Sequence, residues 1–325
     1  MITTLTLNPC IDKTLIVPSF QVGEMNRVSE SKIVYAGKGF NVSKGIANLG
    51  FETTITGFMY SNDAEKALSS IESAGKGKIH SDCVICPGNL RVNVKVFDEK
   101  TRKVTEINEP GVPTNEQFVN KIIHKTVELS KQSSYLILSG SIPPKCPVDI
   151  YSQIIKSVKE NPANKCQIVL DINGAPLKSV FSQKMEINKL SMPDIIKPNK
   201  DEFETLVNKK LQSKEEIKKE AVKIINTFGI KIICVSLGGE GAFISDGKES
   251  FFAPTVKNIV VKGTVCAGDS LVAGLVTGLA QNMKLKDAFR RAIASATSCV
   301  MQGASSVVSQ ELLNDIIDRV EINEI

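Results

Sequence analysis

The stretch VCAGDSLVAG, residues 265–274, places a single acid, Asp269, among small and apolar residues. Apolar side chains recur at helical spacing from there on, which predicts a helix that buries this face: Leu271, Val272, Leu275, Val276 and Leu279. Asp269 then lies in the first turn, where the helix dipole favours an anion. Two interpretations are open: Asp269 is a capping acid, or it is a catalytic base beside an anion hole of free backbone N–H groups.

Apolar runs and amphipathic stretches alternate along the rest of the chain. Buried strands are predicted at Ile2–Leu7, Tyr135–Leu138, Gln167–Leu170 and Lys231–Val235. Helices are predicted at Asn115–Leu129 and Lys214–Phe228, and at Phe40–Leu49 with Gly50 as its C-terminal glycine. This alternation predicts an α/β fold with a mainly parallel central sheet flanked by helices, and ligands at the carboxyl ends of the strands.

Two regions interrupt the alternation. Residues 13–36 and 91–107 read as strand pairs without intervening helices, the second pair turning at Asp98–Lys103. Such segments predict a small β-sheet that acts as a lid or a dimer contact, with an edge hairpin as the alternative. No linker separates independent parts, so residues 1–325 are expected to form a single domain.

Composition narrows the function. The 325 residues carry a net charge of +5 without a long like-charge block, so no nucleic-acid partner is expected. The start lacks signal-peptide features and no apolar run is long enough to span a bilayer, which predicts a cytoplasmic protein without a membrane partner. Eight scattered cysteines read as reduced core residues. His80, Cys83 and Cys86 lack a fourth ligand for zinc.

Two further segments are rich in glycine. In AGKGFNVSKGIANLG, residues 36–50, Gly37 and Gly39 permit close backbone approach to a ligand, and Lys38 adds a charge. VSLGGEGAF, residues 235–243, follows a strand and can lie flat against a nucleotide. Neither is a Walker A loop nor a Rossmann fingerprint, which argues against a nicotinamide-dependent oxidoreductase. Taken singly, each segment also fits an ordinary turn.

Six motifs in order give the chain a family resemblance: TLNPCID, AGKGFNVSKGIANLG, LSGSIPP, IKPNKDE, VSLGGEGAF and TVCAGDSLVAGL. Together they resemble the ribokinase-like sugar kinases of the phosphofructokinase B branch, and most of all its ketohexose-phosphate kinases, the 1-phosphofructokinases and tagatose-6-phosphate kinases. The resemblance implies a ribokinase-like fold with a small β lid that often forms a homodimer. It also implies ATP and Mg²⁺, and transfer of the γ-phosphoryl group to a sugar hydroxyl.

The resemblance assigns the donor side of the site. Asp269 matches the catalytic base, with Ala267 and Gly268 at the anion hole and Thr264 in the same loop. Asn199 and Glu202 match an N-x-x-E element tied to Mg²⁺ through water, and Lys197 in the same element is given a structural role. The nucleotide loop is assigned to Ser236, Leu237, Gly238, Gly239, Glu240 and Gly241.

The resemblance also assigns the acceptor side. Asp12 matches the acid that binds sugar hydroxyls, and Arg27 and Arg91 match a clamp for the phosphate of the substrate. Asn93 and Lys95 alternate with Arg91 on one strand face and assist it. The rest of the pocket is assigned to Gly37, Lys38, Gly39, Asn41 and Ser139.

These assignments predict phosphorylation of fructose 1-phosphate to fructose 1,6-bisphosphate. Tagatose 6-phosphate is the alternative acceptor, and a non-catalytic regulator that binds a sugar phosphate is a more distant one. The helix N-terminus is expected to lower the pKa of Asp269. Cys266 stands where the resemblance implies glycine, and we expect it to be tolerated there without a positive φ angle.

Overall fold

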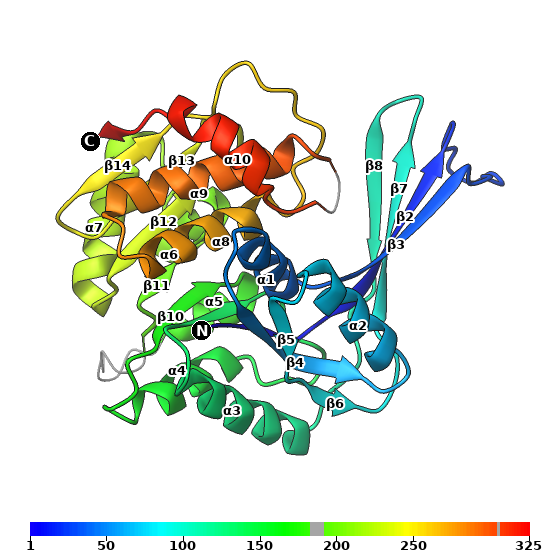
Figure 1. The fold of residues 1–325 in the computed structure, drawn as a ribbon, viewed down its shortest axis with the longest axis horizontal. Coiled ribbons are helices and arrows are strands. Elements are labelled where there is room, and N and C mark those ends of the chain that lie inside the picture. Colours follow the sequence, from blue (N-terminus) through cyan, green and yellow to red (C-terminus); the bar gives the residue numbers. More distant parts are fainter. Residues whose placement is uncertain (183–191, 304–305) are drawn as a thin grey trace.

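A sheet of eleven strands forms the centre of the computed structural model, which describes residues 1–182, 192–303 and 306–325 (Figure 1). In spatial order it contains β15 (Asn323–Glu324), β14 (Ser250–Ala253), β13 (Ala242–Ser245), β12 (Ile232–Ser236), β11 (Ile195–Ile196), β10 (Gln167–Asp171), β9 (Tyr135–Ser139), β1 (Ile2–Thr6), β4 (Thr53–Tyr60) and β5 (Ile79–Ser81), while β6 (Val84–Cys86) pairs with the last residues of β4. The strands from β12 to β5 and β6 are parallel, and β13 to β15 form an antiparallel edge.

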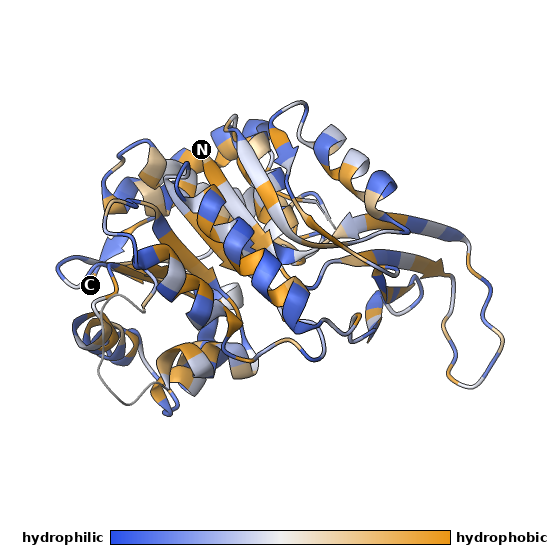
Figure 2. Cartoon of the chain, turned by 90° about the horizontal axis from the view of Figure 1, so that it is seen from below, coloured by the Kyte–Doolittle hydropathy of each residue, from blue (hydrophilic) through white to orange (hydrophobic). Residues whose placement is uncertain are grey.

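The parallel strands are apolar on both faces because helices cover both. In β9, Leu136 and Leu138 belong to one apolar cluster and Ile137 to the other, as expected from the two-residue repeat of a strand. One face carries α1 (Lys38–Asn48), α8 (Ala267–Ala280), α9 (Leu285–Val300) and α10 (Gln310–Ile316). The other carries α2 (Ala64–Ala74), α3 (Glu116–Ser130), α4 (Ile150–Lys159), α5 (Gly174–Phe181), α6 (Lys200–Val207) and α7 (Lys214–Phe228). Figure 2 shows the hydrophobic colouring of the strands between the helices.

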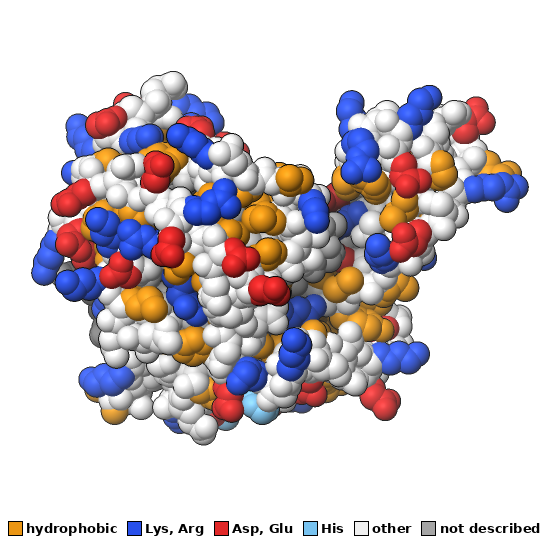
Figure 3. Space-filling view, turned by 45° about the horizontal axis from the view of Figure 1, so that its top comes forward, with side chains coloured by type: hydrophobic (Ala, Val, Ile, Leu, Met, Phe, Trp, Pro, Cys, Tyr) orange, Lys and Arg blue, Asp and Glu red, His pale blue; other side chains and the backbone are white. Residues whose placement is uncertain are grey.

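A second sheet of four strands projects from this body at one side (Figure 1). Its order is β3 (Glu30–Ala36), β2 (Cys10–Val17), β7 (Arg91–Asp98) and β8 (Lys103–Asn108). The central pair, β2 and β7, is parallel, and both outer pairs are antiparallel. In the space-filling view the surface is hollowed between this sheet and the helical body (Figure 3).

The fold confirms the predicted α/β class, with a mainly parallel sheet and a separate small sheet. The helix at Lys214–Phe228 has its predicted bounds, and Asn115 caps α3 by accepting a hydrogen bond from the Phe118 N–H. Gly50 follows α1 with a φ of 91°, as a C-terminal glycine does. Helix α1 begins at Lys38, two residues earlier than predicted. No helix of the described residues is long and apolar enough to cross a membrane.

Candidate active site

Helix α8 begins with Cys266 as its N-cap residue, in the left-handed conformation at φ 64° and ψ 3°. The expectation that Cys266 avoids a positive φ is therefore wrong. The turn that aims the free N–H groups of α8 requires this conformation, in which a side chain is strained and glycine is not. A cysteine thus occupies a position suited to glycine, beside Ala267 and Gly268 at the start of the helix.

Asp269 lies in the first turn of α8 and is 6% exposed. Its Oδ2 accepts a 3.0 Å hydrogen bond from Nδ2 of Asn41 in α1. Burial, followed by the negative charge of Asp171, raises the pKa of Asp269 to about 6. The expectation of a lowered pKa is wrong, because loss of solvent and a second carboxylate outweigh the helix dipole. A carboxylate with this pKa is a competent general base near neutral pH.

A cavity of about 630 Å³ lies between the first residues of α8 and the glycine-rich loop after β12. Most of the residues predicted for the donor side line it: Asn199, Ser236, Gly238, Gly239, Gly241, Thr264, Ala267 and Gly268. Gly241, at φ 112°, is required here, because a Cβ would lie 2.0 Å from the carbonyl oxygen of Ala253. The sequence reasoning missed the apolar wall, which α8, α9 and the loop after β14 supply: Val256, Ile259, Val261, Leu271, Ile293, Ala296 and Val300.

Two predicted nucleotide-loop residues do not line this cavity. Leu237 is buried and packs into the core beside the loop. The Glu240 carboxylate lies 3.8 Å from the Lys200 ammonium group. Leu237 is the N-cap of η2 (Gly238–Glu240) and Glu240 is its last residue, so both shape the loop that contains the glycines.

A smaller cavity of about 170 Å³ lies at the carboxyl ends of β1 and β9. Four predicted acceptor residues line it: Gly37, Lys38, Arg91 and Ser139. The sequence reasoning missed its other lining residues, Thr6, Asn8, Gly140, Ser141 and Asn173. Thr6 and Ser139 are register partners, and neither side-chain hydroxyl has a hydrogen-bond partner among the described residues. Buried, unpartnered hydroxyls of this kind suit a polar ligand rich in hydroxyl groups.

Gly39 does not line the smaller cavity, and its lack of a side chain is needed for packing. A Cβ on Gly39 would lie 2.7 Å from the Leu5 carbonyl oxygen, so glycine lets the start of α1 press against β1. This close approach brings Lys38 to the smaller cavity and Asn41 to Asp269.

The second sheet holds the predicted acid and arginine on one connected network. Asp12 in β2 accepts a 2.7 Å bond from Lys95 and a 3.1 Å bond from Asn93, both in β7. Arg91 donates to the Asn8 carbonyl oxygen at 3.3 Å and to Asn93 Oδ1 at 3.1 Å. The strand register explains this, because Asp12 pairs with Asn93 and Lys95 follows on the same face.

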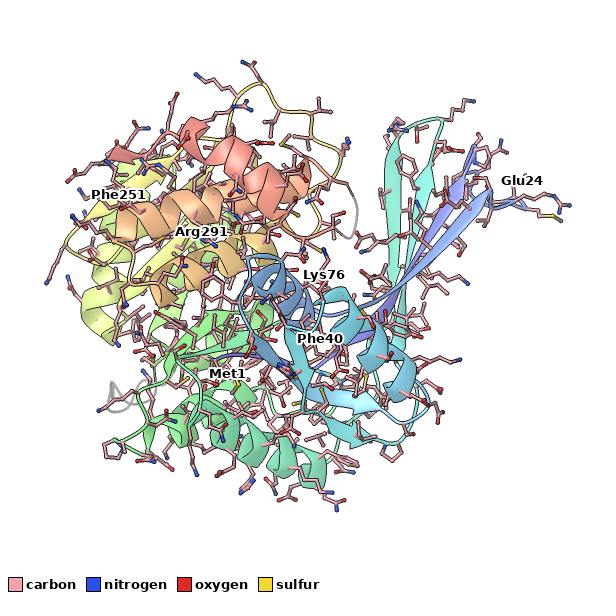
Figure 4. The ribbon with its side chains drawn as sticks, in the orientation of Figure 1. Met1, Glu24, Phe40, Lys76, Phe251 and Arg291 are labelled. Atoms are coloured by element: carbon pink, nitrogen blue, oxygen red, sulfur yellow. The ribbon has the colours of Figure 1, made fainter. Side chains whose placement is uncertain are left out.

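Arg27 lies apart from these groups. It is exposed in the loop between β2 and β3, and it lines neither cavity. Figure 4 labels Glu24 of the same loop, at the far tip of the projecting sheet and well away from Phe40 in α1. The structure therefore brings Arg91 to the acceptor cavity but does not bring Arg27 there within one chain.

Asn199 and Glu202 form a capping box at the start of α6. Asn199 Oδ1 accepts from the Glu202 N–H, and Glu202 Oε2 accepts from the Asn199 N–H, both at 2.8 Å. This arrangement leaves Glu202 Oε1 without a hydrogen bond to any residue that the structure describes. Of the two residues, only Asn199 lines the larger cavity. One free carboxylate oxygen beside it fits Mg²⁺, which takes few protein ligands when it is bound with nucleotide phosphates.

An ion-pair cluster lies at the junction of the cavities, and only its Lys38 was predicted as a site residue. Asp171 ends β10, is 1% exposed, and its Oδ1 lies 3.3 Å from Lys38 Nζ and 3.2 Å from Lys197 Nζ. Burial pushes the pKa of Asp171 upward, but the two ammonium groups outweigh it and hold the pKa below its usual value. An acid that ends a buried apolar run, as in QIVLD, was the sequence signal for it.

The larger cavity and the small polar cavity both lie where the strands of a parallel sheet end, which is where α/β folds bind small-molecule ligands. The chain belongs to the pfkB family of carbohydrate kinases, whose family model matches residues 5–311. Members of this family are ATP-dependent kinases, and this chain is an enzyme of that class.

Known proteins resemble it over nearly their whole length. A 1-phosphofructokinase of Borreliella burgdorferi is 31% identical over 303 residues, covering 93% of this chain and 92% of that protein. A tagatose-6-phosphate kinase of Staphylococcus epidermidis is 29% identical over 330 residues and covers 100% of both. The phosphofructokinase-2 of Escherichia coli, solved in complex with potassium, matches the fold with a TM-score of 0.88 at 24% identity, covering 98% of each chain.

Proposed function

We propose that this protein transfers the γ-phosphoryl group of ATP to fructose 1-phosphate and produces fructose 1,6-bisphosphate. The observation that carries the proposal is the position of Asp269, whose buried carboxylate stands at the start of α8 between the two cavities. Gly268 beside it lines the larger cavity, and Asn41, which bonds it, follows Lys38 of the smaller one.

In this mechanism ATP occupies the larger cavity with its phosphates over the N-terminus of α8. The free N–H groups near Ala267 and Gly268 stabilise charge on the transferring phosphoryl group. Asp269 accepts the proton of the attacking sugar hydroxyl as the oxygen bonds to phosphorus and the bond to ADP breaks. A pKa of about 6 leaves Asp269 ionised at neutral pH yet able to take this proton.

Arg91 supports the choice of a phosphorylated acceptor. Its guanidinium lines the smaller cavity and is held by Asn8 and Asn93, so it is oriented before a ligand arrives. A preset guanidinium is suited to binding a phosphate through two hydrogen bonds. The Asp12 carboxylate, oriented by Lys95, is proposed to bind sugar hydroxyls, and Arg27 remains a proposed phosphate contact.

Glu202 and Asn199 are proposed to hold Mg²⁺ through water. When bound, Mg²⁺ neutralises charge on the nucleotide phosphates. The capping box fixes the Glu202 carboxylate, so its Oε1 is aimed without further ordering of the side chain.

The second sheet is proposed to be a lid that is part of a single kinase domain and also the contact of a homodimer. Its strands carry Asp12 and Arg91, so closure of the sheet would bring both to the substrate. Ile33 and Ile107 are 59% and 61% exposed, and through Lys13 and Val94 they share one cross-strand row. Two exposed isoleucines on one sheet face support a protein contact there.

The proposal is tested by measuring ATP-dependent ADP release with fructose 1-phosphate, tagatose 6-phosphate, fructose 6-phosphate and the free sugars. We expect the highest kcat/KM with fructose 1-phosphate. A higher value with tagatose 6-phosphate, the substrate named for a relative at 29% identity, would select the second candidate. Turnover with none of these acceptors would instead favour a sugar-phosphate-binding regulator and overturn the proposal.

A further inference from the structure

The ion-pair cluster of Asp171, Lys38 and Lys197 has a geometry that a purely structural salt bridge does not need. Both ammonium groups approach the same carboxylate oxygen, Oδ1, at 3.3 and 3.2 Å. The other oxygen, Oδ2, is buried and has no hydrogen-bond partner in the described part of the chain. Burying a carboxylate is costly unless its oxygens accept hydrogen bonds. Here one oxygen has no such bond, whereas the other fixes the positions of two lysines.

The two lysines face different cavities. Lys38 lines the smaller cavity and its side chain is 36% exposed. Lys197 is 5% exposed, and a Cβ placed on Gly268 would lie 3.5 Å from its Nζ. Since Gly268 lines the larger cavity, the Lys197 ammonium group lies directly beside the start of α8. Two cations this close together repel each other, and the shared carboxylate oxygen between them offsets that repulsion.

We propose that Asp171 is a positioning residue that holds Lys38 and Lys197 across the junction of the donor and acceptor cavities, so that both cations face the phosphoryl group in transit. The inference rests on the proposed function and adds to it. Lys197 thereby acquires a role in the reaction. Lys38 contributes from the acceptor side, and Asp171 acts only through the two lysines and through its charge.

The same cluster sets the charge around Asp269. The groups that face Asp269 come from five segments: Lys38 and Asn41 in α1, Asp171 in β10, Lys197 after β11, Cys266 at the start of α8, and Cys299 in α9. Asp171 raises the pKa of Asp269, whereas Lys38, Asn41 and Lys197 lower it. Removing Asp171 or Lys197 should therefore move the pKa of Asp269 in opposite directions.

The experiment compares Asp171→Asn and Lys197→Met with the parent. We expect each to lower kcat by about 100-fold, with little change in the KM for ATP. The acid limb of the kcat–pH profile, where Asp269 protonates, should move by roughly one pH unit, downward in Asp171→Asn and upward in Lys197→Met. A merely structural ion pair would lower the melting temperature without a fall in kcat of this size, while the opposite shifts report the two charges beside Asp269.

Asp194 supplies a matched control at the opposite edge of the sheet. It is also buried and also pairs with two lysines, Lys159 at 3.3 Å and Lys231 at 3.1 Å. Asp194→Asn should lower the melting temperature and leave kcat and the pH profile as in the parent. Should Asp171→Asn fail to fold, the upward shift in Lys197→Met decides the matter alone.

The inference is separable from the identity of the acceptor. The pH profiles are measured with whichever sugar phosphate the parent phosphorylates, and the Asp269 carboxyl is titrated directly by carbon-13 NMR without any substrate. Failure of the parent to use fructose 1-phosphate would contradict the proposed function alone. An Asp269 pKa that is unchanged in both variants, or shifted in the same direction in both, would overturn the role of the cluster.

Discussion

Asn41 and Asp269, 228 positions apart in the sequence, are joined by a 3.0 Å hydrogen bond from the Asn41 amide to Oδ2 of the carboxylate. The bond links the glycine-rich start of α1 to the start of α8 and orients the proposed base. It also lowers the pKa of Asp269 against the larger effects of burial and Asp171. Helix α1 therefore orients the base and contributes to its pKa.

The pH dependence of kcat follows from this relationship. Asp269 must be ionised to accept a proton, so kcat should fall as the pH drops through the pKa of about 6. Asn41→Ala removes a hydrogen bond to the ionised form, so the limb should move to higher pH in that variant. The measurement is kcat between pH 5 and pH 9; a limb that stays in place in Asn41→Ala would contradict the coupling.

Stability should depend on pH through the same carboxyl group. Its pKa is raised from 3.8 to about 6 in the folded protein, so protonated Asp269 is favoured by folding. The contribution is present at low pH and is lost as the pH rises through about 6. Asp269→Asn should thus raise the melting temperature more at pH 8 than at pH 5. Equal changes at the two pH values would show that the folded pKa is not raised.

Arg91→Ala should raise the KM for the sugar phosphate by about 10- to 100-fold while the KM for ATP changes little, because hydrogen bonds to a charged phosphate are lost. Arg102→Ala is the matched control on the same hairpin. The Arg102 guanidinium lies over the Phe97 ring at 5.0 Å, and Arg102 lines neither cavity. The two KM values are measured from initial rates with each substrate varied in turn. Equal rises in both KM values for Arg91→Ala would contradict the proposed phosphate contact of Arg91.

The strain at Cys266 is tested by two variants that both lack the thiol. Only glycine relieves the left-handed conformation at φ 64°, so Cys266→Gly should be more stable than Cys266→Ala by about 1 kcal/mol in urea unfolding. Lys145 is exposed and has a φ of 61°, so Lys145→Gly and Lys145→Ala give the same stability difference at a position away from the site. A Cys266→Ala variant as stable as Cys266→Gly would show that the loop carries no such strain.

Glu202→Gln separates a metal role from a structural one. Glutamine keeps the side-chain acceptor of the capping box, so the melting temperature should stay close to that of the parent. Loss of the charge should raise the Mg²⁺ concentration needed for half-maximal activity. Glu202→Ala should show this increase together with a lower melting temperature. An unchanged Mg²⁺ requirement in Glu202→Gln would remove Glu202 from the metal site.

Much of the fold could be predicted because its signals are local. The apolar runs of β9 and β10 and the amphipathic pattern of Lys214–Phe228 gave elements within a residue of their observed bounds. Most of the polar and glycine lining of the larger cavity was predicted from the glycines after β12 and the small residues before Asp269. In both cases the residues that matter are neighbours in the sequence.

The errors concern properties that the tertiary structure sets. The pKa of Asp269 is raised by burial and by Asp171, which joins the site only when β10 lies near α8. The conformation of Cys266 depends on the turn into α8, and glycine-like geometry at a cysteine has no signature in composition. The approach of Lys197 to Gly268 also crosses more than 70 positions of sequence, so no local pattern predicts it.

The central claim is that Asp269 is the base of a sugar-phosphate kinase, and the direct measurement is the rate of phosphoryl transfer by Asp269→Asn under saturating ATP and fructose 1-phosphate. We predict a fall in kcat of roughly 10³-fold or more, with the Kd for ATP within about threefold of the parent because Asp269 acts on the acceptor hydroxyl. Turnover close to that of the parent, with a folded protein and unchanged ATP binding, would contradict the account.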